Sequence, residues 1–186
     1  MRLALAIAAV VPGCAVATNA ALGVQGVSVG GHSKAAQGKV ALGIGEVESA
    51  APAAGEQGTQ NYLEVEGSAG WPSNADDNAF QGSLLVGLEH MSYGFDHGWY
   101  VAGDAGVRST GSTSGALLQV GAGPLWFLDA HVDTDAAEFR ATSIGLELSV
   151  GVMPAQRDVV FGVGLAVRHD AIGWRGQRRD LPPLFR

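Results

Sequence analysis

The segment 115–132, GALLQVGAGPLWFLDAHV, alternates between two kinds of side chain at every step. One set is apolar throughout: Leu118, Val120, Ala122, Pro124, Trp126, Leu128, Ala130 and Val132. The other set mixes glycine, polar and apolar residues: Leu117, Gln119, Gly121, Gly123, Leu125, Phe127, Asp129 and His131. Successive side chains of a strand point to opposite faces, so this pattern predicts a β-strand with one continuous apolar face. The fold depends on whether that face looks into a protein core or out into lipid.

Similar alternation recurs along the chain, between clusters of Gly, Ser, Asn, Asp and Pro that are typical of turns. In the first strand the apolar positions change parity near Gly26, between Val24 and Val27, which predicts a β-bulge. Residues 67–78, GSAGWPSNADDN, read as a loop. The short connections favour an antiparallel meander of about eight strands. The predicted strands are 20–29, 38–48, 59–66, 79–91, 99–108, 115–132, 138–152 and 159–168.

The composition is unusual for a water-soluble domain. The 186 residues include 28 glycines and only 16% are charged, whereas soluble chains carry about a quarter charged residues. The net charge is −7 and no basic stripe is present. Nucleic-acid partners are therefore excluded, because phosphate binding needs clustered Lys and Arg. The length fits one domain.

The N-terminal stretch MRLALAIAAVVPGCAVATNA reads as a secretory signal, with an apolar run too short to span a bilayer as a helix. AVA at 15–17 suits ordinary signal peptidase, whereas VPGC at 11–14 resembles a lipobox in which Cys14 is acylated. We expect a signal peptide at 1–17, or at 1–13 if Cys14 is lipidated. A β-barrel domain at 18–174 and a C-terminal tail at 175–186 follow. Both cleavage sites imply a protein of the cell envelope.

The mixed face of the predicted strands is a poor water-facing surface. It consists of Gly, Ala and Ser with isolated charges of both signs, and the chain holds only two lysines, Lys34 and Lys39. Small residues with a few opposite charges suit the interior of a narrow closed barrel, where they pair with one another. The apolar face would then meet lipid. The predicted interior charge network is Glu89, Asp104, Arg108, Glu147 and Arg168.

Dyad repeats such as SIGLELSVGV and VVFGVGLAV, downstream of a signal peptide, resemble the small eight-stranded outer-membrane β-barrels of Gram-negative bacteria. The resemblance implies an all-β, antiparallel up-and-down barrel of about eight strands that spans the outer membrane as a monomer. Its partners would be membrane lipids and the envelope assembly machinery. Such proteins usually end on the last strand with a terminal aromatic residue, whereas this chain runs on through RGQRRDLPPLFR.

One pattern suggests an enzyme. His90 and Ser92, with Asp104 farther on, resemble the catalytic pattern of outer-membrane lipid A 3-O-deacylases. In such a triad the histidine takes the serine proton and the carboxylate orients the imidazole. In that family the pair lies near the C-terminal end of the barrel and an asparagine follows it, whereas here it lies mid-chain before Tyr93. The alternative is a histidine and a serine in a turn near the membrane edge.

Two groups of acidic residues could bind cations. The oxygen-rich run of Asp129, His131, Asp133 and Asp135 has a spacing that would place all four on one strand face. A solvated hairpin turn is the alternative. The other group, Glu46, Glu48, Glu64 and Glu66, would repel one another across a ladder, so we expect these residues at strand ends in water or weakly binding cations. No cofactor is expected.

The sequence therefore predicts an outer-membrane barrel with a non-enzymatic structural or surface-interaction role. A bore of eight strands is filled by side chains, which disfavours a diffusion pore. The alternative is a periplasmic, lipid-anchored barrel or sandwich that binds a small apolar ligand or a protein partner through an inward apolar face. The second alternative is a lipid hydrolase that uses His90 and Ser92.

Overall fold

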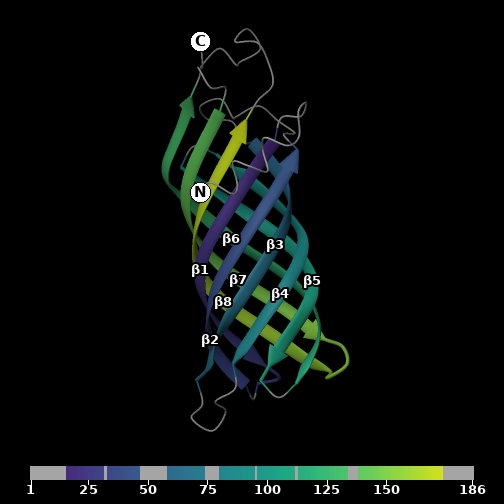
Figure 1. Cartoon of the computed structure of the whole chain (residues 1–186). Helices are drawn as coiled ribbons and strands as arrows, with labels where there is room; N and C mark the ends of the chain where they lie inside the picture. The colour runs from purple at the N-terminus through teal and green to yellow at the C-terminus, as the bar shows by residue number, and fades with distance from the viewer. Residues whose placement is uncertain are drawn as a thin grey trace.

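The computed structural model describes residues 16–31, 33–46, 58–73, 80–94, 96–111, 113–133 and 138–173. They form eight strands in which each pairs antiparallel with the next, and β8 closes on β1 (Figure 1). The predicted all-β, antiparallel up-and-down barrel is confirmed. None of the described residues forms a helix that is long and apolar enough to cross a membrane. The strands are β1 Val16–Val29, β2 Ser33–Glu46, β3 Gly58–Pro72, β4 Gln81–Tyr93, β5 His97–Thr110, β6 Ser114–Asp133, β7 Glu138–Met153 and β8 Asp158–Gly173.

The strand register fixes the tilt of the barrel wall. A walk from partner to partner around the barrel, begun at Thr18 on β1, returns to β1 at Ser28, ten residues farther along. A stagger of this size requires strands tilted by ~40° to the barrel axis. The partners on the way are Ile44, Leu63, Leu88, Gly103, Val120, Val150 and Phe161.

The two ends of the barrel differ in their connections. We call the end where β1 begins and β8 ends the terminal end, drawn at the top of Figure 1, and the opposite end the turn end. Residues 30–32, 111–113 and 154–157 connect strands at the turn end, as does the longer stretch 73–80. Three glycines there have left-handed backbones, Gly30, Gly31 and Gly111. Tight turns between strands need such residues because a Cβ disfavours positive φ.

Gly30 gives the first testable prediction. Its φ is +56°, and a Cβ there would lie 2.7 Å from Asp158 Oδ1. We expect Gly30→Ala to lower the free energy of unfolding by about 1–2 kcal/mol, the usual cost of a left-handed residue that carries a Cβ. Urea unfolding of the barrel in phospholipid vesicles measures this.

Gly26→Ala is the matched control, because the nearest atom to its added Cβ is the Val163 carbonyl oxygen at 3.9 Å. Its effect should stay within about 0.5 kcal/mol. Equal losses in the two variants would show that the turn conformation is not what Gly30 supplies.

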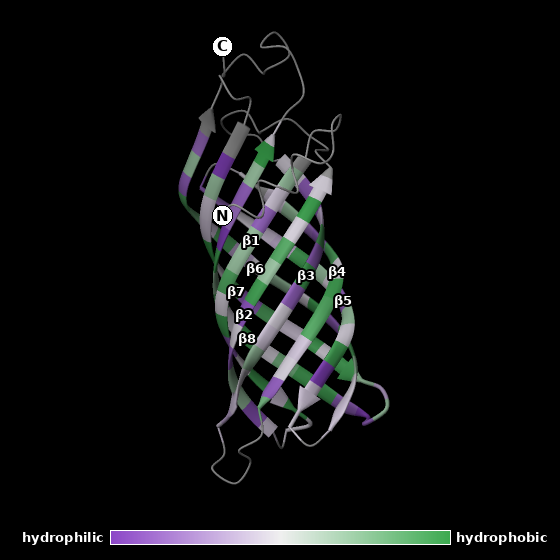
Figure 2. Ribbon diagram, viewed as in Figure 1, coloured by the Kyte–Doolittle hydropathy of each residue, from purple (hydrophilic) through white to green (hydrophobic). Residues whose placement is uncertain are grey.

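Large apolar side chains point outward on all eight strands, and hydrophobic and hydrophilic residues alternate along each ribbon in Figure 2. Leu22, Leu88 and Leu128 are each 65% exposed or more. The inward positions between these residues are filled by small, polar and charged side chains together with two apolar clusters. The apolar face of the alternating segments is therefore the outside of the barrel.

The bulge predicted near Gly26 is wrong. The ladders of β1 with β2 and with β8 run without interruption through Gly26. The apolar positions change parity because the filling of the interior changes: Gln25 is buried among polar groups, whereas Val27 and Val29 belong to an inner apolar cluster. The register shift in the barrel wall lies instead on β6, between Phe127 and Asp129.

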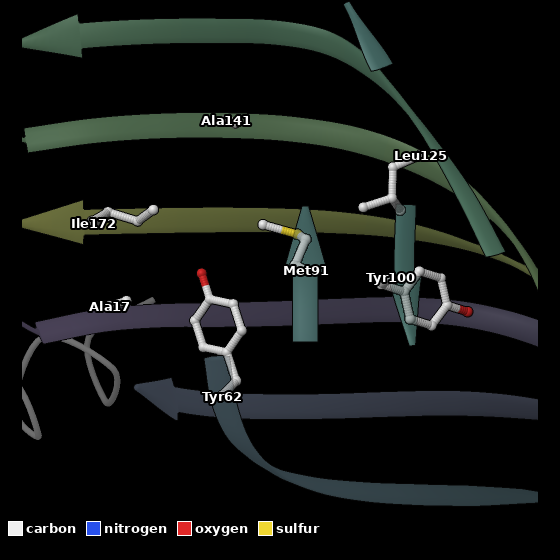
Figure 3. Close-up of a cluster of buried hydrophobic side chains, with 7 residues drawn as sticks. All are labelled: Ala17, Tyr62, Met91, Tyr100, Leu125, Ala141 and Ile172. Carbon is white, nitrogen blue, oxygen red and sulfur yellow. The ribbon is translucent and has the colours of Figure 1, made fainter. Parts of the chain in front are cut away.

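Two apolar clusters fill the interior, one near each end. Figure 3 shows the first, the terminal plug, to which every strand except β2 contributes one side chain: Ala17, Tyr62, Met91, Tyr100, Leu125, Ala141 and Ile172. The second, the turn plug, consists of Val27, Val29, Leu85, Leu117, Met153 and Val160. Charged residues lie between the two plugs, as the inward order Leu85, Glu89, Met91 along β4 shows.

The predicted tail at 175–186 and most of the predicted signal peptide, with Cys14, lie outside the described residues. Val16 and Ala17, which the 1–17 boundary assigns to the signal peptide, are the first two residues of β1. Ala17 is fully buried in the terminal plug. Cleavage after Ala17 would therefore shorten β1, whereas cleavage before Cys14 would leave it whole.

Candidate functional site

The middle of the barrel holds a layer of buried charges. All five residues of the predicted network, Glu89, Asp104, Arg108, Glu147 and Arg168, are inside and at most 9% exposed. Lys39, Glu64, Glu66 and Asp170 are buried with them. These residues come from six of the eight strands, so their interactions join walls of the barrel that are not sequence neighbours.

Arg168 on β8 is the centre of one part of this layer. Its Nη2 donates a hydrogen bond to Glu89 on β4 and lies 3.7 Å from Glu64 Oε2 on β3. Its guanidinium also stacks over the ring of Tyr100, 4.9 Å from the centroid. Asn19 on β1 donates a second hydrogen bond to Glu89, at 2.9 Å. One cation therefore holds four strands together across the bore.

Lys39 on β2 is the centre of the other part. Its Nζ lies 2.7 Å from Glu66 Oε2 on β3 and 2.5 Å from Glu147 Oε1 on β7. All three side chains are at most 8% exposed. Burial of charges is costly unless they are paired, so this bridge offsets the cost of two interior carboxylates.

The two parts surround a small cavity of about 10 Å³, which has room for about one water molecule. Carboxylates outnumber cations in its lining: Glu64, Glu66, Glu89, Asp104 and Glu147 against Lys39 and Arg168. The plugs lie above and below this cavity. Among the described residues, the arrangement therefore fills and braces the bore and leaves only this small cavity within the layer.

Two predicted members of the network stand apart from these bridges. Asp104 occupies the space beside Gly87 on β4, where a Cβ would collide with its carboxylate. Arg108, nearer the turn end, is 2% exposed, and its Nε and Nη2 have no hydrogen-bond partner among the described residues. Of the five predicted residues, Glu89, Glu147 and Arg168 therefore form ion pairs. Asp104 and Arg108 are buried in the same interior but lie outside these ion pairs.

The prediction for Glu64 and Glu66 is wrong, because they lie inside the barrel rather than at strand ends in water. They alternate with Leu63 and Val65 along β3, so an outward apolar row requires inward glutamates. The like-charge repulsion is relieved by Lys39 and Arg168 from other strands. The alternation of apolar and acidic residues in YLEVE, 62–66, is the sequence pattern that could have predicted these inward positions. Lys39, which the predicted network omitted, supplies the counter-charge. The side chains of Glu46 and Glu48 lie outside the described residues.

The structure does not assemble the predicted triad. His90 faces outward, shares a 2.7 Å hydrogen bond with Asn61 and lies against Trp99, with ring centroids 5.6 Å apart. Asp104 faces the interior. The barrel wall therefore separates the imidazole from the carboxylate that would orient it. Ser92 is buried, two residues beyond His90 on β4.

The predicted ion site is only partly within the described residues. Asp129 and His131 are exposed, and Asp135 and the side chain of Asp133 lie outside the described part. No group of three or more His, Cys, Asp or Glu in the described ranges is placed to hold a metal ion. The register shift before Asp129 changes the parity of β6, which moves Asp129 and His131 to the outer side.

The outer surface has aromatic residues near both ends of the apolar band. Trp99 and Trp126 lie toward the terminal end, and Trp71 packs edge-on against Phe80 toward the turn end. Along β3 the outward face runs from polar Asn61 to Trp71 through Leu63 and Val65. The ten steps from Asn61 to Trp71 span ~25 Å of barrel axis at a rise of ~3.3 Å per residue and a tilt of ~40°. Such a band equals the apolar belt of membrane barrels, ~25 Å tall between aromatic girdles.

Outward polar residues cap this band at each end. Asn61, His90, Thr142 and His169 lie toward the terminal end, and Thr142 and His169 share a 3.1 Å hydrogen bond. Lys34, Ser109 and Ser114 lie toward the turn end.

No protein-family model, curated protein or solved structure matches this chain significantly.

Proposed function

We propose that the chain is an outer-membrane β-barrel whose apolar band faces lipid and whose role is structural or surface-interacting rather than enzymatic. The observation that carries the proposal is the inverted distribution of side chains. Val, Leu, Phe and Trp cover the outside of all eight strands, while the middle of the interior holds paired charges. In water this arrangement would expose an apolar patch far larger than soluble monomers carry.

Closure of the barrel also supports a lipid environment for the apolar band. Unpaired backbone groups cost several kcal/mol each in hydrocarbon, so strands that span a membrane must form a closed sheet. Here β8 pairs with β1 along thirteen register positions, and no strand edge is open within the apolar band. The localisation in a Gram-negative outer membrane rests on the signal-like N-terminus together with this architecture.

The interior argues against a transport role. The bore contains two apolar plugs and a cavity of about 10 Å³ between them. The alternative of a periplasmic barrel with an apolar ligand inside requires an inward apolar face, and that face points outward. We therefore place the partner-binding surfaces of this protein at the barrel ends and not in the bore.

Cell fractionation tests the proposal. The envelope pellet of expressing cells is extracted with carbonate and run on an SDS gel with and without boiling. We expect retention in the pellet and a mobility shift on boiling, because a closed barrel embedded in lipid resists carbonate extraction and stays folded in SDS until it is boiled. Release into the soluble fraction without a shift would contradict the proposal.

A further inference from the structure

One strand edge is open at the terminal end of the barrel. β6 pairs with β5 only as far as His97↔Trp126, after which Phe127 N donates one hydrogen bond to Asp96 O at 3.1 Å. On its other side β6 stays paired with β7 up to Asp133↔Glu138. Figure 1 shows these two strands, in green, projecting beyond β5. Within the described part of the chain, the β5-side edge of residues 128–133 has no strand partner.

The two faces of this projecting segment have different chemistry. The register shift leaves Asp129 opposite Thr142 and His131 opposite Arg140, all on the outer side. Ala130 lies opposite Ala141, which is buried in the terminal plug. Directly opposed residues of an antiparallel pair share a face. A strand added beside β6 would therefore alternate between a polar outer row and an apolar inner row.

Charge selects the partner. Residues 128–138, LDAHVDTDAAE, hold four carboxylates and no Lys or Arg. Antiparallel pairing of two copies about His131 would set Asp129 of one copy against Asp133 of the other, and like charges facing across a ladder are destabilising. A segment with Lys or Arg on the outer row would instead set a cation beside Asp129, which is exposed.

We propose that the open edge of β6, residues 128–133, binds an extended basic polypeptide segment by strand addition. Main-chain hydrogen bonds to the open edge supply the affinity, and Asp129 on the outer row supplies the selectivity. The inference deepens the surface-interaction role proposed above and rests on it. It names an extended segment that alternates basic and small apolar residues as the partner.

The test uses the full chain folded in detergent micelles, with barrel closure checked first by the mobility shift on boiling. A labelled peptide of alternating Lys and Val is titrated while the exchange of the amide hydrogens of residues 128–133 is followed by NMR. We expect saturable binding and slower exchange at alternate amides of this segment. The same peptide with N-methyl groups on every second residue is the control, and the version that blocks the edge-facing amides should not bind.

Asp129→Lys keeps the edge and reverses its charge, and it should fold because Asp129 is exposed. We expect it to bind the Lys/Val peptide about fivefold more weakly and a Glu/Val peptide correspondingly better. Three results would overturn the proposal: equal binding by the N-methylated peptide, slow exchange of the edge-facing amides of 128–133 before any peptide is added, or no binding by a barrel that shows the mobility shift. A barrel that fails the mobility shift would instead contradict the proposed function.

Discussion

Val86→Arg should lower the free energy of unfolding of the membrane-inserted barrel by about 2–4 kcal/mol, the cost of an arginine on the lipid face near the bilayer midplane. Val86 faces outward on β4, 49% exposed, between the exposed Leu84 and Leu88. In a water-facing surface the same substitution would change stability by about 0.5 kcal/mol or less. Urea unfolding in phospholipid vesicles measures the difference.

Ser109→Arg is the matched control, because Ser109 faces outward near the end of β5, beyond the apolar band. An arginine there reaches the interface, where the cost falls to about 0–1 kcal/mol. The informative result is how the loss of stability depends on the depth of the arginine in the bilayer. Equal and small effects of the two arginines would mean that the apolar band does not lie in hydrocarbon.

Arg168→Met should lower the free energy of unfolding by about 3–5 kcal/mol, since removal of one partner leaves buried charges uncompensated. Arg168 is 4% exposed, and its loss would strand Glu89 and Glu64 in the middle of the bore. The same unfolding measurement reports the effect. The thermal midpoint of the mobility shift on a gel should fall with it.

The double variant Arg168→Met/Glu89→Gln separates charge from packing. Neutralising Glu89 removes part of the uncompensated charge, so the double variant should be more stable than Arg168→Met alone. Arg140→Met serves as the exposed control, with an expected change below about 1 kcal/mol. If the double variant were as unstable as the single one, the buried ion pair would not be what Arg168 contributes.

The later strands were predictable because their alternation is strong. The run from Val159 to Arg168 lies within β8, Asp158–Gly173, with its apolar residues outward as the lipid-facing interpretation requires. By contrast, the predicted loop 67–78 begins with six residues that belong to β3. Gly67, Ser68 and Ala69 have no large side chains to reveal a period. Their ladders with β2 and β4 hold them in the strand. Gly70 belongs to the same strand and lies so close to β2 that a Cβ there would collide with the Ala36 carbonyl oxygen.

The charge layer was predictable by position but not by pairing. Glu147 and Arg168 stand alone among small residues on their strands, which marks them as interior groups. The partner of Glu147 is Lys39, 108 residues away in the sequence. No local pattern relates the two, because the contact depends on the stagger of the strands and on barrel closure. The placement of Asp129 was hidden for a similar reason, since a single register shift reverses the faces beyond it.

The central claim, that the apolar band faces lipid, is tested most directly by nitroxide accessibility along the outward face of β4. Single cysteines at Leu84, Val86, Leu88 and His90, in a Cys14→Ser background, carry the label in vesicle-inserted protein. Collisions with oxygen, which concentrates in hydrocarbon, are compared with collisions with a water-soluble nickel chelate. The lipid-facing account predicts that the oxygen-to-nickel ratio is highest at Val86 and falls toward His90. A nickel chelate that reaches Val86 as readily as His90 would contradict it.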